Sequence, residues 1–423
     1  MSAENFRLTT LDNGLIVATD AMATVETTSV GVWVNAGTRH ETAEINGISH
    51  MLEHMAFKGT RRRSAQSIAE EIEAVGGHLN AYTSREHTAY YAKVLKEDRA
   101  LALDIIADIL QHSTLDAGEL AREQAVVVQE ISQAIDTPDD IIFDHFQATA
   151  YPDQAVGRPV LGTADLVRGF TRETLAHYMS AHYGPRRMVL TAAGNLDHDA
   201  LVDEARALFT ALPADRPPPH DPARYAGGDY REERDLEQVH LVLGFEGVPY
   251  DDPDFYAASV LSTLLGGGMS SRLFQEVREK RGLVYGIYSF LTSFNDGGLF
   301  SIYAGTGEDE AAEVLPVVCD EVMKVTQSVT ADEVQRARAQ LKASILMALE
   351  SSGSRCEQLA RQMLAFGRPL TTAEVVGHIE AVDEAAVLKV ARRLFTGKSA
   401  PTFAAIGPLG GVEDYARLTA RLG

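Results

Sequence analysis

Residues 46–60 read NGISHMLEHMAFKGT and combine the pattern of a buried helix with ionisable side chains. The apolar residues Met51, Leu52 and Met55 have the spacing of a core-facing helix. His50, Glu53 and His54 lie in the same run, at positions that share one helix face. Burying ionisable groups without partners is costly, so this face needs a chemical explanation.

Two histidines at positions i and i+4 can bind one metal ion, and zinc accepts imidazole nitrogens at ~2.0–2.1 Å. Glu53 lies on the same face and can hold a metal-bound water without occupying a coordination position. The order H-x-x-E-H is the reverse of the H-E-x-x-H motif of many zinc peptidases. The alternative is a pair of histidines at a helix edge that are satisfied by solvent or by hydrogen bonds.

A zinc enzyme needs a third protein ligand and an open fourth position. The stretch LAREQAVVVQEISQAI, residues 120–135, carries Glu123 and Glu130 on one face of a predicted helix. We expect Glu130 to be buried in this apolar run, where binding a cation would compensate its charge. Glu123 is a candidate for orienting a ligand histidine. The alternative for Glu123 is an ordinary exposed helix residue.

A proline-rich segment divides the chain. PADRPPPHDPARYAGGD, residues 213–229, holds five of the 15 prolines and has no hydrophobic period. It predicts a linker at 213–232 between domains at 1–212 and 233–423. The order of predicted strands and helices repeats with an offset of about 210 residues. We therefore expect an α+β fold of two similar tandem domains, each a mostly antiparallel sheet with helices packed largely on one face.

The two copies differ at the histidine motif. With this offset the trio corresponds to Val260, Thr263 and Leu264 in the second copy, which is mainly apolar there. A requirement of the fold would appear in both copies, so the difference favours a chemical role for the trio in the first.

Composition excludes some classes of protein. The net charge of −22 argues against a nucleic-acid-binding protein, which would carry a basic surface. No apolar run approaches the ~18 residues of a membrane-spanning helix. Cys319 and Cys356 fit no metal or redox spacing, and we expect both to be reduced. The first residues do not resemble a secretory signal, which favours a cytoplasmic location.

The motif HMLEH followed by Glu130 resembles that of the pitrilysin family (M16) of inverted-zincin metallopeptidases, which includes insulin-degrading enzyme and the mitochondrial processing peptidase. The resemblance covers essentially the whole chain. It is strongest for the two-domain branch, represented by the processing-peptidase β subunit and its bacterial relatives. It implies a LuxS/MPP-like metallohydrolase fold and a zinc endopeptidase with one Zn²⁺ per chain.

The resemblance also implies roles for individual residues. His50, His54 and Glu130 would bind the zinc, and Glu53 would be the general base. Arg278 and Tyr285 lie seven positions apart in SSRLFQEVREKRGLVYGIYSF, residues 270–290. In the family a pair at this spacing binds the substrate carbonyl and stabilises the oxyanion. The alternatives are a surface arginine and a tyrosine in the core.

Substrate binding is expected at residues 79–84, which read as a strand. In the family this strand is a sheet edge that pairs with the peptide, here through the main chain of Asn80 and Ala81. Gly266–Gly268 are interpreted as a helix end and loop, although they also resemble the glycine-rich loop of the processing peptidase's α subunit.

The expected partners are a peptide substrate and a second chain. A homodimer with two sites is the simplest assembly, and a heterodimer with a zinc-free homologue is the alternative. A mitochondrial matrix location would apply if a presequence had been removed. Two other functions remain open: a scaffold without activity, like the core subunits of respiratory complex III, and a peptidase dedicated to maturing one modified peptide.

Overall fold

The computed structural model describes residues 6–214 and 221–423, and the chain forms two compact units. The first unit comprises Met1–Ser132, Arg158–Asp221 and Met347–Thr371. The second comprises Gln133–Gly157, Pro222–Leu346 and Thr372–Gly423. The predicted fold class, an α+β fold of two similar tandem domains, is confirmed. However, each unit contains a segment from the other half of the chain, which the contiguous division at 213–232 does not include.

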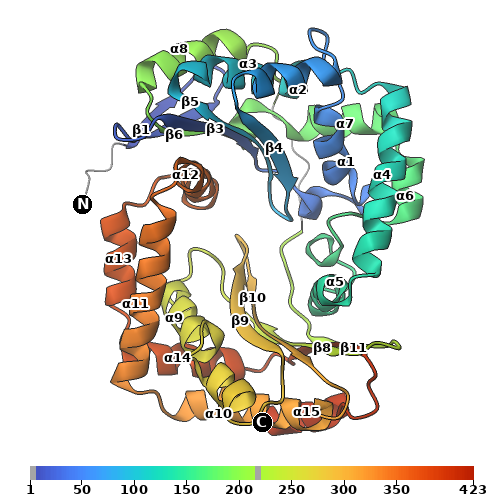
Figure 1. Cartoon of the computed structure of the whole chain (residues 1–423), viewed down its shortest axis with the longest axis vertical. Coiled ribbons are helices and arrows are strands. Elements are labelled where there is room, and N and C mark those ends of the chain that lie inside the picture. The colour runs from blue at the N-terminus through green and yellow to red at the C-terminus, as the bar shows by residue number, and fades with distance from the viewer. Residues whose placement is uncertain (1–5, 215–220) are drawn as a thin grey trace. The chain divides into compact units, whose positions relative to one another are not determined.

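The first unit is built on a six-stranded sheet with the order β1-β2-β6-β3-β5-β4 (Figure 1). Its strands are β1 Phe6–Thr10, β2 Ile16–Ala21, β3 Thr27–Val34, β4 His78–Thr83, β5 Thr88–Leu95 and β6 Met188–Gly194. All neighbouring pairs are antiparallel except β2 and β6. Strand β4 therefore forms one edge of the sheet, and the predicted edge strand has an unpaired side.

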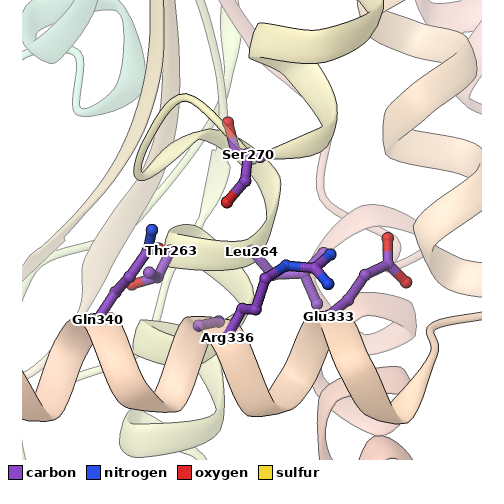
Figure 2. Close-up of a pocket in the computed structure, with 8 residues that line it drawn as sticks. Thr263, Leu264, Ser270, Glu333, Arg336 and Gln340 are labelled. Atoms are coloured by element: carbon purple, nitrogen blue, oxygen red, sulfur yellow. The ribbon is translucent and has the colours of Figure 1, made fainter.

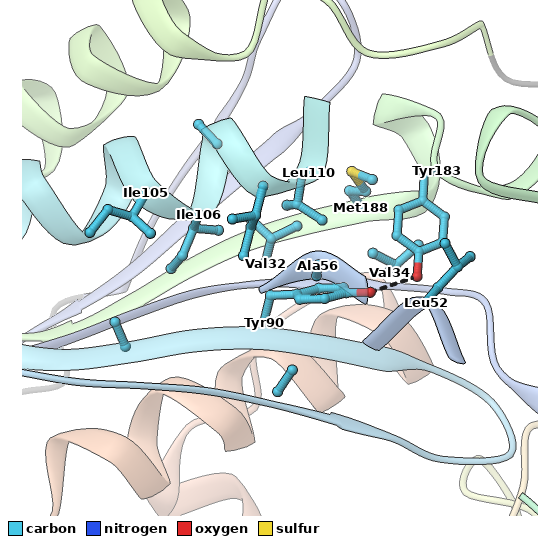
Figure 3. Close-up of a cluster of buried hydrophobic side chains, with 14 of the residues drawn as sticks. Val32, Val34, Leu52, Ala56, Tyr90, Ile105, Ile106, Leu110, Tyr183 and Met188 are labelled. Carbon is cyan, nitrogen blue, oxygen red and sulfur yellow. Dashed lines mark hydrogen bonds between the residues drawn. The ribbon is translucent and has the colours of Figure 1, made fainter. Parts of the chain in front are cut away.

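Most helices of the first unit come from the first half of the chain. They are α1 Ile48–Ala56, α2 Ala65–Ala74, α3 Arg99–His112, the greater part of α4 Ala117–Ile135, α6 Ala164–Gly169, α7 Arg172–His182 and α8 His198–Leu208. Alternate residues of β3, including Val32 and Val34, join Ile106 of α3 in an extensive hydrophobic core (Figure 3). Within this core the hydroxyl groups of Tyr90 and Tyr183 are 2.9 Å apart, so each polar group is satisfied.

Helix α12, Ser352–Phe366, covers the opposite face of this sheet (Figure 1). Cys356 and Ala360 pack in one cluster with Trp33 and Ala193. The expectation that helices lie largely on one face is therefore incomplete for this unit. The physical reason is that β3 buries both of its faces, which leaves no side of the strand facing water.

The second unit contains a five-stranded sheet with the order β7-β11-β8-β10-β9. Its strands are β7 Gly228–Glu233, β8 Val239–Glu246, β9 Gly286–Ser293, β10 Gly298–Thr306 and β11 Thr402–Gly407. Only β7 and β11 are parallel. Its helices from the second half of the chain are α9 Phe255–Gly266, α10 Ala311–Gln327, α11 Ala331–Ala348, α13 Thr372–Glu380, α14 Glu384–Phe395, α15 Tyr415–Leu422 and a π-helical stretch Phe274–Glu279.

Helix α5, Pro138–Ala150, belongs to this second unit although its sequence lies in the first half. Ile142 and Phe146 pack with Val242 of β8 and with Ile406 of β11. Gly244 is required at this contact, because an added Cβ would lie 2.2 Å from the Phe146 ring.

The predicted linker at 213–232 is corrected at its end, where Gly228–Glu233 form strand β7. Residues 215–220 lie outside the described residues. The strand forms because β11 supplies a parallel partner for its backbone, a long-range pairing that local composition does not reveal. Gly227, with φ +74°, precedes it and turns the chain close to the carbonyl oxygen of Ala400.

Cys319 and Cys356 are both free in this structure, and both are buried. Among the described residues, no helix combines the length and apolar character that crossing a membrane requires.

Candidate metal centre

Helix α1 positions the histidine motif. The Glu41 carboxylate accepts hydrogen bonds from the backbone N–H groups of Gly47 (2.7 Å) and Ser49 (2.8 Å), which satisfies the start of the helix. Gly47 has φ +97°, a conformation that favours glycine. Met51 and Met55 are fully buried in the core of the first unit. This packing fixes the rotation of α1 and hence the direction of its polar side chains.

The side chains of His50, His54 and Glu130 converge within the first unit. Glu130 Oε2 lies 3.6 Å from His50 Nε2 and 3.4 Å from His54 Nε2. One ligand atom from each of the three residues lies within 4.8 Å of the others. Two ligands at ~2.0–2.1 Å from a tetrahedral zinc ion are about 3.4 Å apart. Two imidazole nitrogens and one carboxylate oxygen at this spacing therefore fit a tetrahedral zinc ion. The fourth coordination position is left open.

Burial sets the protonation of the site. Desolvation, reinforced by the neighbouring His54, lowers the pKa of His50 to about 4, so its ring is neutral near pH 7, as a metal ligand requires. Burial also raises the pKa of Glu53. Hydrogen bonding from the side chain and backbone of Thr83, together with the electrostatic interaction with His54, opposes this shift. Glu53 Oε2 is buried and has no hydrogen-bond partner among the described residues. This oxygen is thus available to a bound water.

The two glutamates of α4 differ from expectation in their burial. The predicted burial of Glu130 is wrong, because 39% of its side chain is exposed. Glu123 is instead the buried residue, with 8% of its side chain exposed, which excludes the ordinary surface alternative. The inward face of α4 is formed by Leu120, Val127 and Ile131, and Glu123 shares that face.

Glu123 contacts one histidine of the motif. Its Oε2 accepts a hydrogen bond from His54 Nδ1 at 3.0 Å, which leaves His54 Nε2 toward Glu130. Glu123 Oε1 accepts a second bond from Lys58 Nζ at 2.7 Å.

Lys58 and Thr83 are contacts of this site that the sequence did not single out. Lys58 lies four positions after His54, a spacing that places two side chains on adjacent turns. The four-residue spacing could have drawn attention to Lys58, but many surface lysines have the same spacing from a polar residue. Thr83 ends strand β4, which pairs with β5 and contacts α1, an arrangement that sequence spacing does not reveal.

Asn80 and Ala81 lie on the edge strand β4. Asn80 is exposed and Ala81 is buried. The Asn80 side-chain oxygen accepts a hydrogen bond from the Ala81 backbone N–H at 2.9 Å. Any strand that pairs through this N–H must first displace the Asn80 side chain.

Arg278 and Tyr285 come together within the second unit. Arg278 Nε donates to the Tyr285 carbonyl oxygen at 3.2 Å, and its guanidinium lies 4.8 Å from the centre of the Phe274 ring. Tyr285 is 68% exposed, so core packing is excluded as its role. Arg278 lies in the π-helical stretch Phe274–Glu279, a local geometry often found at functional sites.

Helix α9 ends at Gly266–Gly268, as predicted from the sequence. An added Cβ at Gly267 would lie 2.6 Å from the Thr263 Cα, so close packing explains this glycine. Beyond the loop, Ser270, Arg336 and Gln340 line a small pocket that opens to solvent (Figure 2).

Family models match both halves of the chain. The model described as Insulinase (Peptidase family M16) matches residues 16–164, and the Peptidase M16 inactive domain matches residues 169–341. The chain belongs to peptidase family M16. It is therefore a metallopeptidase of the zinc-dependent class.

Relatives in this family are similar over nearly the whole chain. An uncharacterized zinc protease of Rickettsia felis is 41% identical over 96% of this chain and 98% of its own. The human mitochondrial-processing peptidase subunit beta is 37% identical over 98% of this chain and 87% of its own. Among solved structures, a protease from Helicobacter pylori has a TM-score of 0.90 at 22% identity, covering 96% of this chain and 100% of that one. At this identity the structural likeness shows the M16 fold alone.

Proposed function

We propose that this M16 chain is an endopeptidase that binds one Zn²⁺ through His50, His54 and Glu130 and cleaves peptides bound as an extended strand. The observation that carries the proposal is the convergence of these three ligand atoms within 4.8 Å. A bound zinc ion would lower the pKa of a water molecule toward ~7 and polarise the scissile carbonyl group.

Glu53 is the general base in this proposal. Its Oε2 has no competing hydrogen bond from the described residues, so it can accept a proton from the attacking water. The same carboxyl group then delivers the proton to the leaving amine. Burial raises the pKa of Glu53, which suits a group that must both accept and release a proton.

Arg278 and Tyr285 are assigned to the oxyanion. An exposed phenol and a guanidinium provide the donors that a developing negative charge requires. The hydrogen bond from Arg278 to the Tyr285 carbonyl couples the positions of the two residues.

The substrate pairs with strand β4 through the main chain of Asn80 and Ala81. Pairing at a sheet edge gives affinity with limited dependence on sequence. The Asn80 side chain already satisfies the Ala81 N–H, so it protects the edge until a peptide replaces it. Similarity to the mitochondrial-processing peptidase β subunit supports presequence-like peptides as one substrate class.

We propose a homodimer with two metal sites, since one chain carries both the zinc motif and the Arg278/Tyr285 pair. Light scattering of the purified chain would show a dimer mass. A monomer that becomes active only with a zinc-free homologue would instead establish the heterodimer.

A substitution of Glu53 tests the proposed function. Glu53→Gln removes the proton acceptor and keeps the side-chain volume, so peptide cleavage should fall by about 10²- to 10⁴-fold. Digestion of a varied peptide library, followed by mass spectrometry, measures this loss, and zinc content should remain one ion per chain. Glu73→Gln, on the exposed face of α2, is the matched control. Equal cleavage by the wild type and Glu53→Gln would refute the mechanism, and a wild type that takes up no zinc would favour a scaffold.

A further inference from the structure

We propose that Lys58 is a positioning residue for the metal centre, acting through Glu123 on His54. The inference rests on the proposed zinc site and concerns how one of its ligands is oriented. The chain of contacts runs from Lys58 Nζ to Glu123 Oε1 at 2.7 Å, and from Glu123 Oε2 to His54 Nδ1 at 3.0 Å.

The backbone around Lys58 is fixed by a turn. Lys58 N donates to the Met55 carbonyl oxygen at 3.2 Å, directly after helix α1 ends. Gly59 has φ +113°, and its carbonyl oxygen accepts a hydrogen bond from Thr114 N at 3.1 Å. Lys58 therefore starts from a backbone position that is attached both to α1 and to the segment after α3.

A buried ion network anchors the same turn to α3. Thr60 Oγ1 donates to Asp108 Oδ2 at 2.7 Å, and Arg63 Nη1 donates to the same oxygen at 2.9 Å. The Asp108 side chain is fully buried and that of Arg63 is 8% exposed. Because these bonds are shielded from water, they hold the turn firmly.

Glu123 needs two partners at its position. Its side chain is 8% exposed, and an unpaired carboxylate oxygen is costly there. Lys58 satisfies one oxygen, so the carboxylate plane has a defined orientation toward the His54 ring. With Nδ1 held in this way, Nε2 is the nitrogen of His54 that faces Glu130.

Among the described residues, Lys58 is the only lysine or arginine that forms an ion pair with Glu123. Arg122 precedes Glu123 in sequence, but its Nε donates to Glu119 Oε2 at 3.2 Å on the exposed side of α4. Lys58 and Arg122 thus carry the same charge, but the Lys58 side chain contacts Glu123 and the Arg122 side chain contacts Glu119. This pair provides a matched comparison.

The test is the zinc affinity of Lys58→Met, measured by competition with a chelating dye. Loss of an outer contact of this kind weakens metal binding by about 10- to 100-fold. We expect that loss for Lys58→Met, partial recovery in Lys58→Arg, and a change under about twofold for Arg122→Met. The absorption spectrum of the Co²⁺-loaded protein should change in Lys58→Met and not in Arg122→Met.

A double-mutant cycle separates positioning from general stability. In a Glu123→Gln background, Lys58→Met should cause little further loss of affinity, since both act on His54 by one route. Additive losses, or a Lys58→Met protein that binds zinc like the wild type, would overturn the inference while leaving the proposed function intact. A wild type without zinc affinity would overturn both.

Thermal unfolding of the metal-free variants supplies the remaining control. Unfolding temperatures close to the wild type, together with reduced zinc affinity, support positioning. If Lys58→Met and Lys58→Arg both fail to fold while Arg122→Met folds, Lys58 is a structural residue and the proposal is wrong.

Discussion

Buried histidines give the first unit a characteristic response to acid. Burial lowers the pKa of His50, His87 and His182 to about 4, whereas an unfolded histidine titrates near ~6.5. As the pH falls below ~6.5, the unfolded chain takes up protons that the folded chain does not. The folded state is therefore destabilised between pH ~6.5 and about 4.

His182 offers a way to test this response away from the metal centre. Its ring stacks on Tyr178 with centroids 4.2 Å apart, so His182→Phe should keep the packing and remove one titrating group. We expect the unfolding temperature of the metal-free variant to fall less than that of the wild type between pH 7 and pH 5, as ~6.5 is crossed. Calorimetry in the presence of a chelator measures this.

The control for the acid response is the exposed His78→Phe, whose ring already contacts water in the folded chain. An unchanged pH dependence in His182→Phe would show that the acid response comes from other groups.

For individual residues, the sequence predicts correctly which side chains come together at the candidate metal centre. It predicts less well how exposed each of these side chains is. The spacing of His50 and His54 is sufficient to place both on one helix face. For α4, sequence neighbours such as Val126 and Val128 suggested that Glu130 was buried, but Val126 is itself exposed. The spacing Leu120, Glu123, Val127, Ile131 identifies the inward face, so the helical period is the better guide.

An ion network around Arg63 links the segment between α1 and α2 to α2 and to α3. Arg63 donates to Glu71 at 2.8 Å, to Asp104 at 2.6 Å and to Asp108 at 2.9 Å. Removing one partner of a buried ion pair leaves an uncompensated charge and costs about 3–5 kcal/mol.

Arg63→Met should therefore lower the free energy of unfolding of the first unit by about 3–5 kcal/mol. Chemical denaturation followed by tyrosine and tryptophan fluorescence measures the change. Arg206→Met, which breaks an exposed pair with Asp203, should cost no more than ~1 kcal/mol. Similar costs for the two variants would show that the network contributes little.

Local patterns predict individual helices and strands, but not which sheet each helix covers. Helices α5 and α12 each have one apolar face, and their sequences do not indicate which sheet that face packs against. The contacts of Phe146 with the second sheet and of Cys356 with the first decide this. Strand β7 could not be predicted for the same reason, because its partner β11 is far away in the sequence.

The two units share a topology that supports a duplicated origin for the chain. In each sheet one pair of neighbouring strands is parallel, β2 with β6 and β7 with β11, and the other pairs are antiparallel. Each unit also receives one helix from the other half of the sequence. The halves of the chain are thus not independent folding units, even though the domains repeat.

Separating the chain between residues 214 and 221 tests this dependence. Fragment 1–214 lacks α12, so the sheet face formed by Trp33, Ala89 and Ala193 loses its cover. Such an exposed apolar face promotes association. We expect this fragment to aggregate in size-exclusion chromatography and to bind a hydrophobic dye. Adding residues 347–371 through a flexible linker should reduce aggregation and dye binding, because α12 then covers this face again. Helix α5 lacks its partners from the second sheet in both fragments, so its effect is the same in the two samples. A soluble, monomeric fragment 1–214 with full zinc affinity would show that α12 is dispensable for the fold of this unit and for its metal centre.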